Sequence, residues 1–289
     1  MNLNTLSREK HILIAGATAS GKSALALEIA QRFGGVIVNA DAIQVYNNWR
    51  ILTARPSLED EKAADHRLYG HQDKEAEYSV GHWLRDVTPL LDGPERLIIV
   101  GGTGLYFTAL TQGLAPIPDI SPDIRLAATE QFESHGLSPL IRELDSATRA
   151  QIDLNNPMRV MRAWEIQKQT GQSLIYWHAQ TPEPMLPALR YEPILFRVEK
   201  EVLNHRISKR FDHMVEIGLL DEARLNVEDF APHHSASKAI GAQDIIHVIN
   251  GLIDLPTAKE RITIATRQFA KRQRTWFNSK MKGWQLYEP

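Results

Sequence analysis

A glycine-rich segment of eight residues constrains the fold of this chain more than any other feature. The apolar run Ile12 to Ala15 precedes it, and Lys22 to Phe33 follows with apolar residues at helical spacing. A strand, a glycine-rich loop and a helix in this order are typical of a phosphate-binding loop, in which backbone N–H groups and the helix N-terminus face anionic oxygens. The segment matches the pattern G-x-x-x-x-G-K-[ST] in full, with the residues Gly16, Ala17, Thr18, Ala19, Ser20, Gly21, Lys22 and Ser23.

The rest of the pattern predicts an α/β fold. Val36 to Val38 forms a second short strand after a Gly-Gly break, and Leu97 to Val100 forms a third before Gly101. Strands that alternate with helices are typical of a parallel, doubly wound sheet. We therefore expect a parallel sheet flanked by helices, as in P-loop nucleotide hydrolases.

A change in the sequence pattern in the middle of the chain predicts a helical insertion. Prolines at 116, 118 and 122 open a stretch with helical patterns and no strand pattern, in which Asn156, Pro157 and Gly171 are typical of the two ends of one helix. A strand from Pro193 to Val198 then returns to the core, and everything after Glu199 is expected to be helical, including a long helix from about Pro256 to Asn278. We expect a core of residues 1–115 and 190–289 and an insertion of residues 116–189.

Composition restricts the classes of protein and the kinds of site. The chain has no cysteine, which excludes disulfides, thiolate zinc sites and thiol catalysis, and its histidine pairs lack metal-ligand spacing. No apolar run is long enough to cross a bilayer, and the first residues lack the features of a signal peptide, so we expect a cytoplasmic protein without a membrane partner. The formal net charge is −2, so any nucleic acid must meet local basic patches.

The third strand lacks the acid that a P-loop hydrolase uses to position Mg²⁺ and water. It ends in Val100-Gly101-Gly102-Thr103-Gly104, and the nearest suitable carboxylate is Asp41, just beyond the second strand. Such a site could transfer a group without activating water. It could also belong to a small-molecule kinase with Asp41 as base, or to a nucleotide-sensing module without catalysis.

Several segments, in order along the chain, resemble tRNA dimethylallyltransferases. The first follows the glycine-rich loop and runs from Asn39 through Asp41 and Gln44 to Tyr46, continuing from Ile51 to Ser57. The others are Gly101 to Tyr106, Arg206-Ile207 with Arg210-Phe211 and Met214, Gly218 to Glu222, Ala265 to Gln273, and Thr275 to Phe277.

This resemblance implies a prenyl transfer. Dimethylallyl diphosphate would donate its five-carbon group to N6 of the adenosine 3′-adjacent to the anticodon, and diphosphate would leave. Gly16 to Ser23 would hold that diphosphate, with Ser23 as the Mg²⁺ ligand. The resemblance implies three catalytic residues: Asp41 as general base, and Thr103 and Arg210 at the leaving group.

The resemblance also implies contacts with the anticodon stem-loop of tRNA, whose target base must leave its stack. We expect the protein to act as a monomer. The sequence departs from the family pattern at Ala17, at Ala42, and at Gly241 to Asp244, where an aromatic residue and a cation are absent. The residues at the family's RNA-contacting positions are Asp41, Ala42, Ile43, Gln44, Thr103, Arg125, Met158, Arg159, Val160, Met161, Arg162, Lys238 and Gln243.

Overall fold

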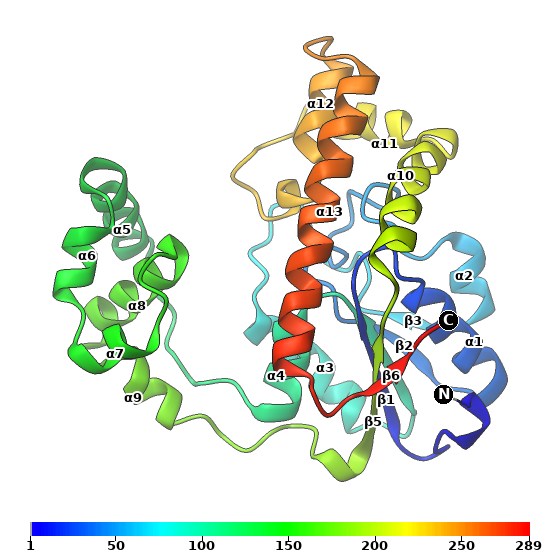
Figure 1. Ribbon diagram of the computed structural model, residues 1–289, viewed down its shortest axis with the longest axis horizontal. Coiled ribbons are helices and arrows are strands. Elements are labelled where there is room, and N and C mark those ends of the chain that lie inside the picture. The colour runs from blue at the N-terminus through cyan, green and yellow to red at the C-terminus, as the bar shows by residue number, and fades with distance from the viewer. Residues whose placement is uncertain (1) are drawn as a thin grey trace. The chain divides into compact units, whose positions relative to one another are not determined.

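The computed structural model describes residues 2–289, and the chain divides into two compact units (Figure 1). The core unit comprises Met1–Thr111 and Met185–Pro289, and the helical unit comprises Gln112–Pro184. The helical unit thus begins and ends a few residues before the expected insertion. None of the helices in residues 2–289 combines the length and apolar character that a membrane span requires.

The core unit contains one six-stranded sheet in which all neighbouring strands are parallel, in the order β3-β2-β4-β1-β5-β6. The predicted parallel α/β architecture is therefore confirmed. The strands are β1 His11–Gly16, β2 Val36–Asn39, β3 His66–Arg67, β4 Leu97–Gly101, β5 Tyr191–Phe196 and β6 Gln285–Tyr287.

The expectation that the chain is helical throughout after Glu199 is wrong at β6. This strand pairs with β5, with Ile194 opposite Gln285 and Phe196 opposite Tyr287. It is three residues long, and two of the three are exposed. An edge strand of this kind carries almost no hydrophobic alternation, which is the signal that a strand prediction needs. The two-residue edge strand β3 was missed for the same reason.

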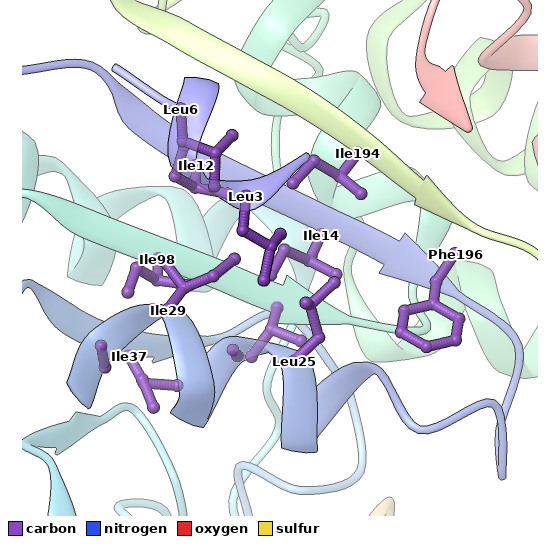
Figure 2. Close-up of a cluster of buried hydrophobic side chains, with 13 residues drawn as sticks. Leu3, Leu6, Ile12, Ile14, Leu25, Ile29, Ile37, Ile98, Ile194 and Phe196 are labelled. Carbon is purple, nitrogen blue, oxygen red and sulfur yellow. The ribbon is translucent and has the colours of Figure 1, made fainter. Parts of the chain in front are cut away.

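One face of the central strands packs on α1 (Lys22–Phe33). Side chains two apart on a strand share a face, so Ile12 and Ile14 of β1 point together towards Leu25 and Ile29 of the helix (Figure 2). All four side chains are almost fully buried. This packing fixes the start of α1 against the end of β1, and with it the loop between them.

Several of the other helices of the core unit pack on one another. The long helix α13 packs against α10 and β1, and α11 packs against α12. The helices besides α1 are α2 Leu58–Ala63, α3 Val80–Leu91, α4 Gly104–Gln112, α10 Lys200–Glu216, α11 Leu219–Asn226, α12 Ala242–Ile249 and α13 Leu255–Lys280, with 3₁₀ turns η1 Leu3–Thr5, η2 Ala188–Arg190 and η3 Ala236–Lys238.

The helical unit has a small core of its own. Helix α8 begins at Pro157, where the Asn156 side chain accepts a hydrogen bond from the Arg159 N–H, and it ends at Gly171 in the left-handed conformation, as predicted. Its Val160 and Trp164 are buried with Leu140. The five helices are α5 Pro122–His135, α6 Leu137–Glu143, α7 Ser146–Gln151, α8 Pro157–Thr170 and α9 Leu174–Ala179.

Candidate active site

The glycine-rich loop joins β1 to α1 and lines a cavity of about 710 Å³, here called the first cavity. Gly21 has φ +104°, a conformation that side chains rarely adopt, and it is the residue immediately before α1. Five of the eight predicted residues line this cavity: Thr18, Ala19, Gly21, Lys22 and Ser23. The other three do not, because Gly16 ends the strand and the side chains of Ala17 and Ser20 are buried away from this cavity.

Three cations gather at this loop. Arg206 donates from Nη1 to the Ser20 carbonyl oxygen at 2.5 Å, and Arg210, one turn further along α10, donates from Nη1 to Thr18 Oγ1 at 2.9 Å. Burial lowers the pKa of Lys22 to about 8, an effect that the charge of Asp41 opposes and that of Arg210 reinforces. The loop is therefore a strongly electropositive lining for an anionic ligand.

The lowered pKa of Lys22 predicts a pH dependence of anion binding. Only the charged ammonium attracts a diphosphate, so affinity should fall as the pH rises above 8, by up to about tenfold per pH unit. Titration calorimetry with Mg²⁺ and inorganic diphosphate, between about pH 7 and pH 9, measures this fall. The same measurement on a Lys22→Met variant gives the pH dependence that comes from the ligand's own titration, which is then subtracted from the wild-type result. The same pH dependence in wild-type protein and variant would contradict the assignment to Lys22.

Asp41 lies two residues beyond the end of β2. Its Oδ1 accepts a hydrogen bond from the Ile43 N–H at 3.0 Å, which closes a tight Asx turn. Its Oδ2 has no hydrogen-bond partner within residues 2–289 and faces Gly102, 3.4 Å from where a Cβ on that glycine would lie. One carboxylate oxygen thus shapes the turn and the other is available.

Thr103 lies beside Asp41 but does not line the first cavity. Its Oγ1 accepts a hydrogen bond from the Ala42 N–H at 2.9 Å, and its own N–H donates to the Ala40 carbonyl oxygen at 3.1 Å. An accepting hydroxyl keeps its own proton to donate elsewhere. Thr103 was predicted to act at the leaving group, and the contacts of its side chain within residues 2–289 are with the turn that carries Asp41.

A second cavity, of about 330 Å³, adjoins the same carboxylate. Its walls are mainly apolar, from Leu52, Phe211 and Ile262, with Lys238 and Arg272 adding positive charge. The two cavities share the lining residues Thr18, Asp41, Thr53, Arg210 and Met214. Asp41 and Arg210 therefore lie where the cavity of the glycine-rich loop meets the apolar second cavity.

Gln273 of α13 joins the two loops of the site, a role that the sequence did not reveal. Its Oε1 accepts from the Thr18 N–H at 2.8 Å, and its Nε2 donates to the Gly102 carbonyl oxygen at 2.9 Å. The Thr18 N–H is consequently not available to a phosphate oxygen. Arg206 was also missed, although its spacing of four from Arg210 places both on one face of a helix.

The residues predicted to contact RNA lie in both units. In the core unit Gln44 lines the first cavity, Ile43 and Lys238 line the second, and Gln243 is exposed on α12. In the helical unit Arg125, Met158, Arg159 and Arg162 are exposed, and Met161 is half-buried. The predicted RNA contact of the Val160 side chain needs correction, because this side chain is fully buried in the core of that unit and cannot present a surface to RNA.

Comparison with known proteins identifies the family. A family model described as IPP transferase matches residues 44–280, and one described as isopentenyl transferase matches residues 9–77. The tRNA dimethylallyltransferase of Roseobacter denitrificans is 54% identical over 97% of this chain and 99% of its own, and that of Ruegeria sp. is 49% identical over 100% and 99%.

Solved structures agree with this result. The tRNA isopentenylpyrophosphate transferase of Bacillus halodurans matches with TM-score 0.68 at 30% identity, over 97% of this chain and 90% of its own. A eukaryotic dimethylallyltransferase acting on tRNA shares the fold, with TM-score 0.77 at 24% identity over 97% of this chain and 74% of its own. The resemblance seen in the sequence is confirmed, and the chain belongs to the IPP transferase family.

Proposed function

We propose that this protein transfers a dimethylallyl group from dimethylallyl diphosphate to N6 of the adenosine 3′-adjacent to the anticodon in tRNA. The observation that carries the proposal is the position of Asp41. Its Oδ2 has no partner within residues 2–289, and the residue lines both the cavity of the phosphate-binding loop and the apolar cavity beside it. A base at that junction can serve an acceptor amine that meets an allylic diphosphate.

The donor's diphosphate fits the first cavity. Lys22, Arg206 and Arg210 supply positive charge there, and the backbone turn at Gly21 leads directly into the N-terminus of α1. Leaving-group departure builds negative charge on the bridging oxygen, so cations already in place stabilise the transition state more than the ground state.

The donor set of this cavity also fits Mg²⁺. Ser23 presents a hard oxygen atom to it, which is the chemistry that Mg²⁺ prefers. No group of three His, Asp or Glu side chains suitable for a metal occurs within residues 2–289, so the remaining ligands would be diphosphate oxygens and water. When bound, Mg²⁺ neutralises part of the charge of the diphosphate.

The bond changes balance without water. The N6 lone pair forms a bond to C1 of the dimethylallyl group while the bond from C1 to the diphosphate oxygen breaks, and the electron pair of that bond leaves with diphosphate. The N6 proton passes to Asp41 Oδ2, because an exocyclic aromatic amine becomes acidic as it is alkylated. The Thr103 hydroxyl, anchored by Ala42, has a proton to donate nearby.

The RNA contacts are proposed on exposure and charge. We propose that Gln44 and Lys238 meet the target nucleotide and its neighbours, and that exposed Arg159 and Arg162 of α8 bind phosphates of the anticodon arm. We propose that the enzyme acts as a monomer, and its tRNA substrate supports a cytoplasmic location. The family assignment favours the transferase over the kinase and the nucleotide-sensing module.

The test is direct. Purified protein with Mg²⁺, dimethylallyl diphosphate and bulk tRNA should yield N6-dimethylallyl adenosine in a nuclease digest analysed by mass spectrometry. Labelled ATP in place of the donor should transfer no phosphate. Absence of the prenylated nucleoside, with a verified substrate tRNA present, would refute the proposal.

A further inference from the structure

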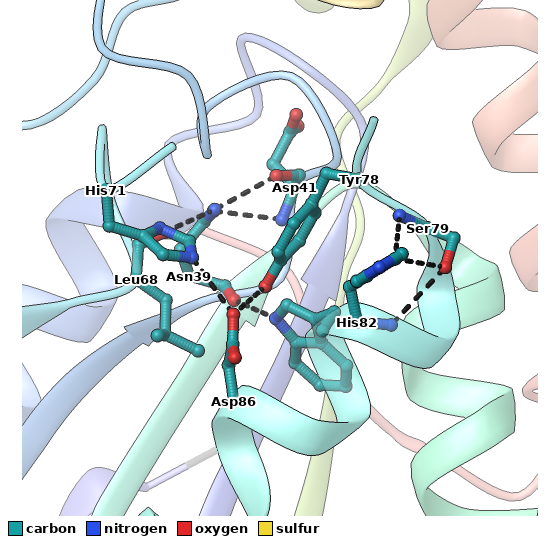
Figure 3. A network of polar contacts seen from close by, with 9 residues as sticks. Asn39, Asp41, Leu68, His71, Tyr78, Ser79, His82 and Asp86 are labelled. Carbon is teal, nitrogen blue, oxygen red and sulfur yellow. Dashed lines mark hydrogen bonds and ion pairs between the residues drawn. The ribbon is translucent and has the colours of Figure 1, made fainter. Parts of the chain in front are cut away.

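The side chain of Asn39 holds the backbone of Asp41 from two sides. Its Oδ1 accepts from the Asp41 N–H at 2.9 Å, and its Nδ2 donates to the Asp41 carbonyl oxygen at 2.9 Å (Figure 3). The same Nδ2 donates to the Leu68 carbonyl oxygen at 3.0 Å. One amide therefore clamps both peptide groups that flank the Asp41 side chain.

Asn39 is itself fixed more firmly than a loop residue. It is the last residue of β2, paired in register with Val100 of β4, and it is fully buried. Its carbonyl oxygen accepts from Trp83 Nε1 at 2.7 Å. Trp83 is fully buried on α3 and stacks on Tyr106, with ring centroids 4.6 Å apart. The turn that carries Asp41 is therefore hydrogen-bonded to a residue that the sheet itself holds in place.

The Trp83 helix is anchored in turn by a second polar group. Tyr78 donates from its hydroxyl to Asp86 Oδ2 at 2.6 Å, and His71 Nε2 lies 3.2 Å from the same oxygen (Figure 3). These contacts tie α3 to the segment that follows β3. The segment also supplies Leu68, so the clamp and its support share one piece of the chain.

We propose that Asn39 is a positioning residue for Asp41, which sets the direction of Oδ2 through the backbone and does not touch substrate. The inference rests on the proposed function of Asp41 as base. Asp41 needs such a device because its Oδ1 binds only the N–H of Ile43, two residues away, which moves with the same turn. Without Asn39, the turn keeps its internal bond and its bonds to Thr103, but the two peptide groups that flank the Asp41 side chain lose their direct hydrogen bonds to β2.

The experiment compares Asn39→Ala and Asn39→Ser with wild-type protein. Displacing a catalytic group by about 1 Å costs up to about 10²-fold in rate, so Asn39→Ala should lower kcat by about 10- to 100-fold. The kcat of Asn39→Ser should lie between those of wild-type protein and Asn39→Ala, because a serine hydroxyl can still accept a hydrogen bond from the N–H two residues on. The Kd for Mg²⁺ with inorganic diphosphate should stay within about twofold, because the phosphate-binding loop is not touched.

Asn226 offers a matched control. It is also a buried asparagine of the core unit, and its Nδ2 donates to the carbonyl oxygens of Asn48 and Glu222, outside both cavities. Asn226→Ala should lose about as much thermal stability as Asn39→Ala loses, but its kcat should stay near the wild-type value.

The outcomes are distinct. A wild-type protein that makes no prenylated adenosine refutes the proposed function. An active wild type with a folded, fully active Asn39→Ala variant overturns the positioning role alone. Unfolding of both Asn39 variants while Asn226→Ala remains folded would assign Asn39 to stability and also overturn it. A graded loss of kcat with unchanged diphosphate binding supports the proposal.

Discussion

Asp41→Asn should lower kcat for prenyl transfer by about 10²- to 10⁴-fold, the usual contribution of a positioned general base. The asparagine keeps the shape of the side chain, and its amide oxygen can still accept from the Ile43 N–H, so the turn should persist. What disappears is the proton-accepting oxygen, Oδ2, at the junction of the two cavities. Single-turnover formation of prenylated adenosine with saturating donor measures the loss in the chemical step.

The control for this substitution is Asp65→Asn. Asp65 is exposed, pairs with Arg67 and lines neither cavity, so its loss should change kcat by no more than about twofold. Diphosphate binding to Asp41→Asn should not weaken, because removing a negative charge near Lys22 and Arg210 favours an anion. Asp41→Asn protein with wild-type kcat would exclude Asp41 as the base.

Much of the fold followed from local sequence signals. The pattern around Gly16 to Lys22 predicted β1, the loop and α1 because each depends on neighbours in sequence: an apolar strand, glycine where φ is positive, and helical periodicity. Helix α8 was predicted for the same reason, since Asn156 and Gly171 act on their own ends of the helix. The edge strands β3 and β6 could not be predicted, because they exist only through pairing with a distant strand.

The same division applies to the site. Lys22 was predicted from the glycine-rich loop pattern, and Asp41 because it comes just after a strand, where a parallel sheet gathers its functional side chains. Gln273 was not predicted, because no local pattern around a buried glutamine in an amphipathic helix indicates that its partners are Thr18 and Gly102. Asn39 was quoted only as part of a motif, since its contacts with both sides of Asp41 depend on the turn itself.

Arg210→Gln should lower kcat by about 10²- to 10³-fold, the range found when one preorganised donor to a developing negative charge is removed. Arg210 lines both cavities, and its Nη1 bond to Thr18 fixes the guanidinium beside the glycine-rich loop. Burial lowers the pKa of Arg210 and the charge of Asp41 opposes that shift, yet a guanidinium stays charged at neutral pH. Its charge is therefore available as the diphosphate leaves.

Lys209→Gln is the matched control, because it removes a positive charge from the neighbouring, exposed position of the same helix. Its kcat should stay within about twofold of wild type, so a larger loss in Arg210→Gln reports position and not net charge. The division of the Arg210 effect between kcat and KM then locates the interaction. Equal losses in kcat and kcat/KM would place the guanidinium on the leaving group in the transition state, whereas a raised KM with unchanged kcat would limit Arg210 to holding the donor.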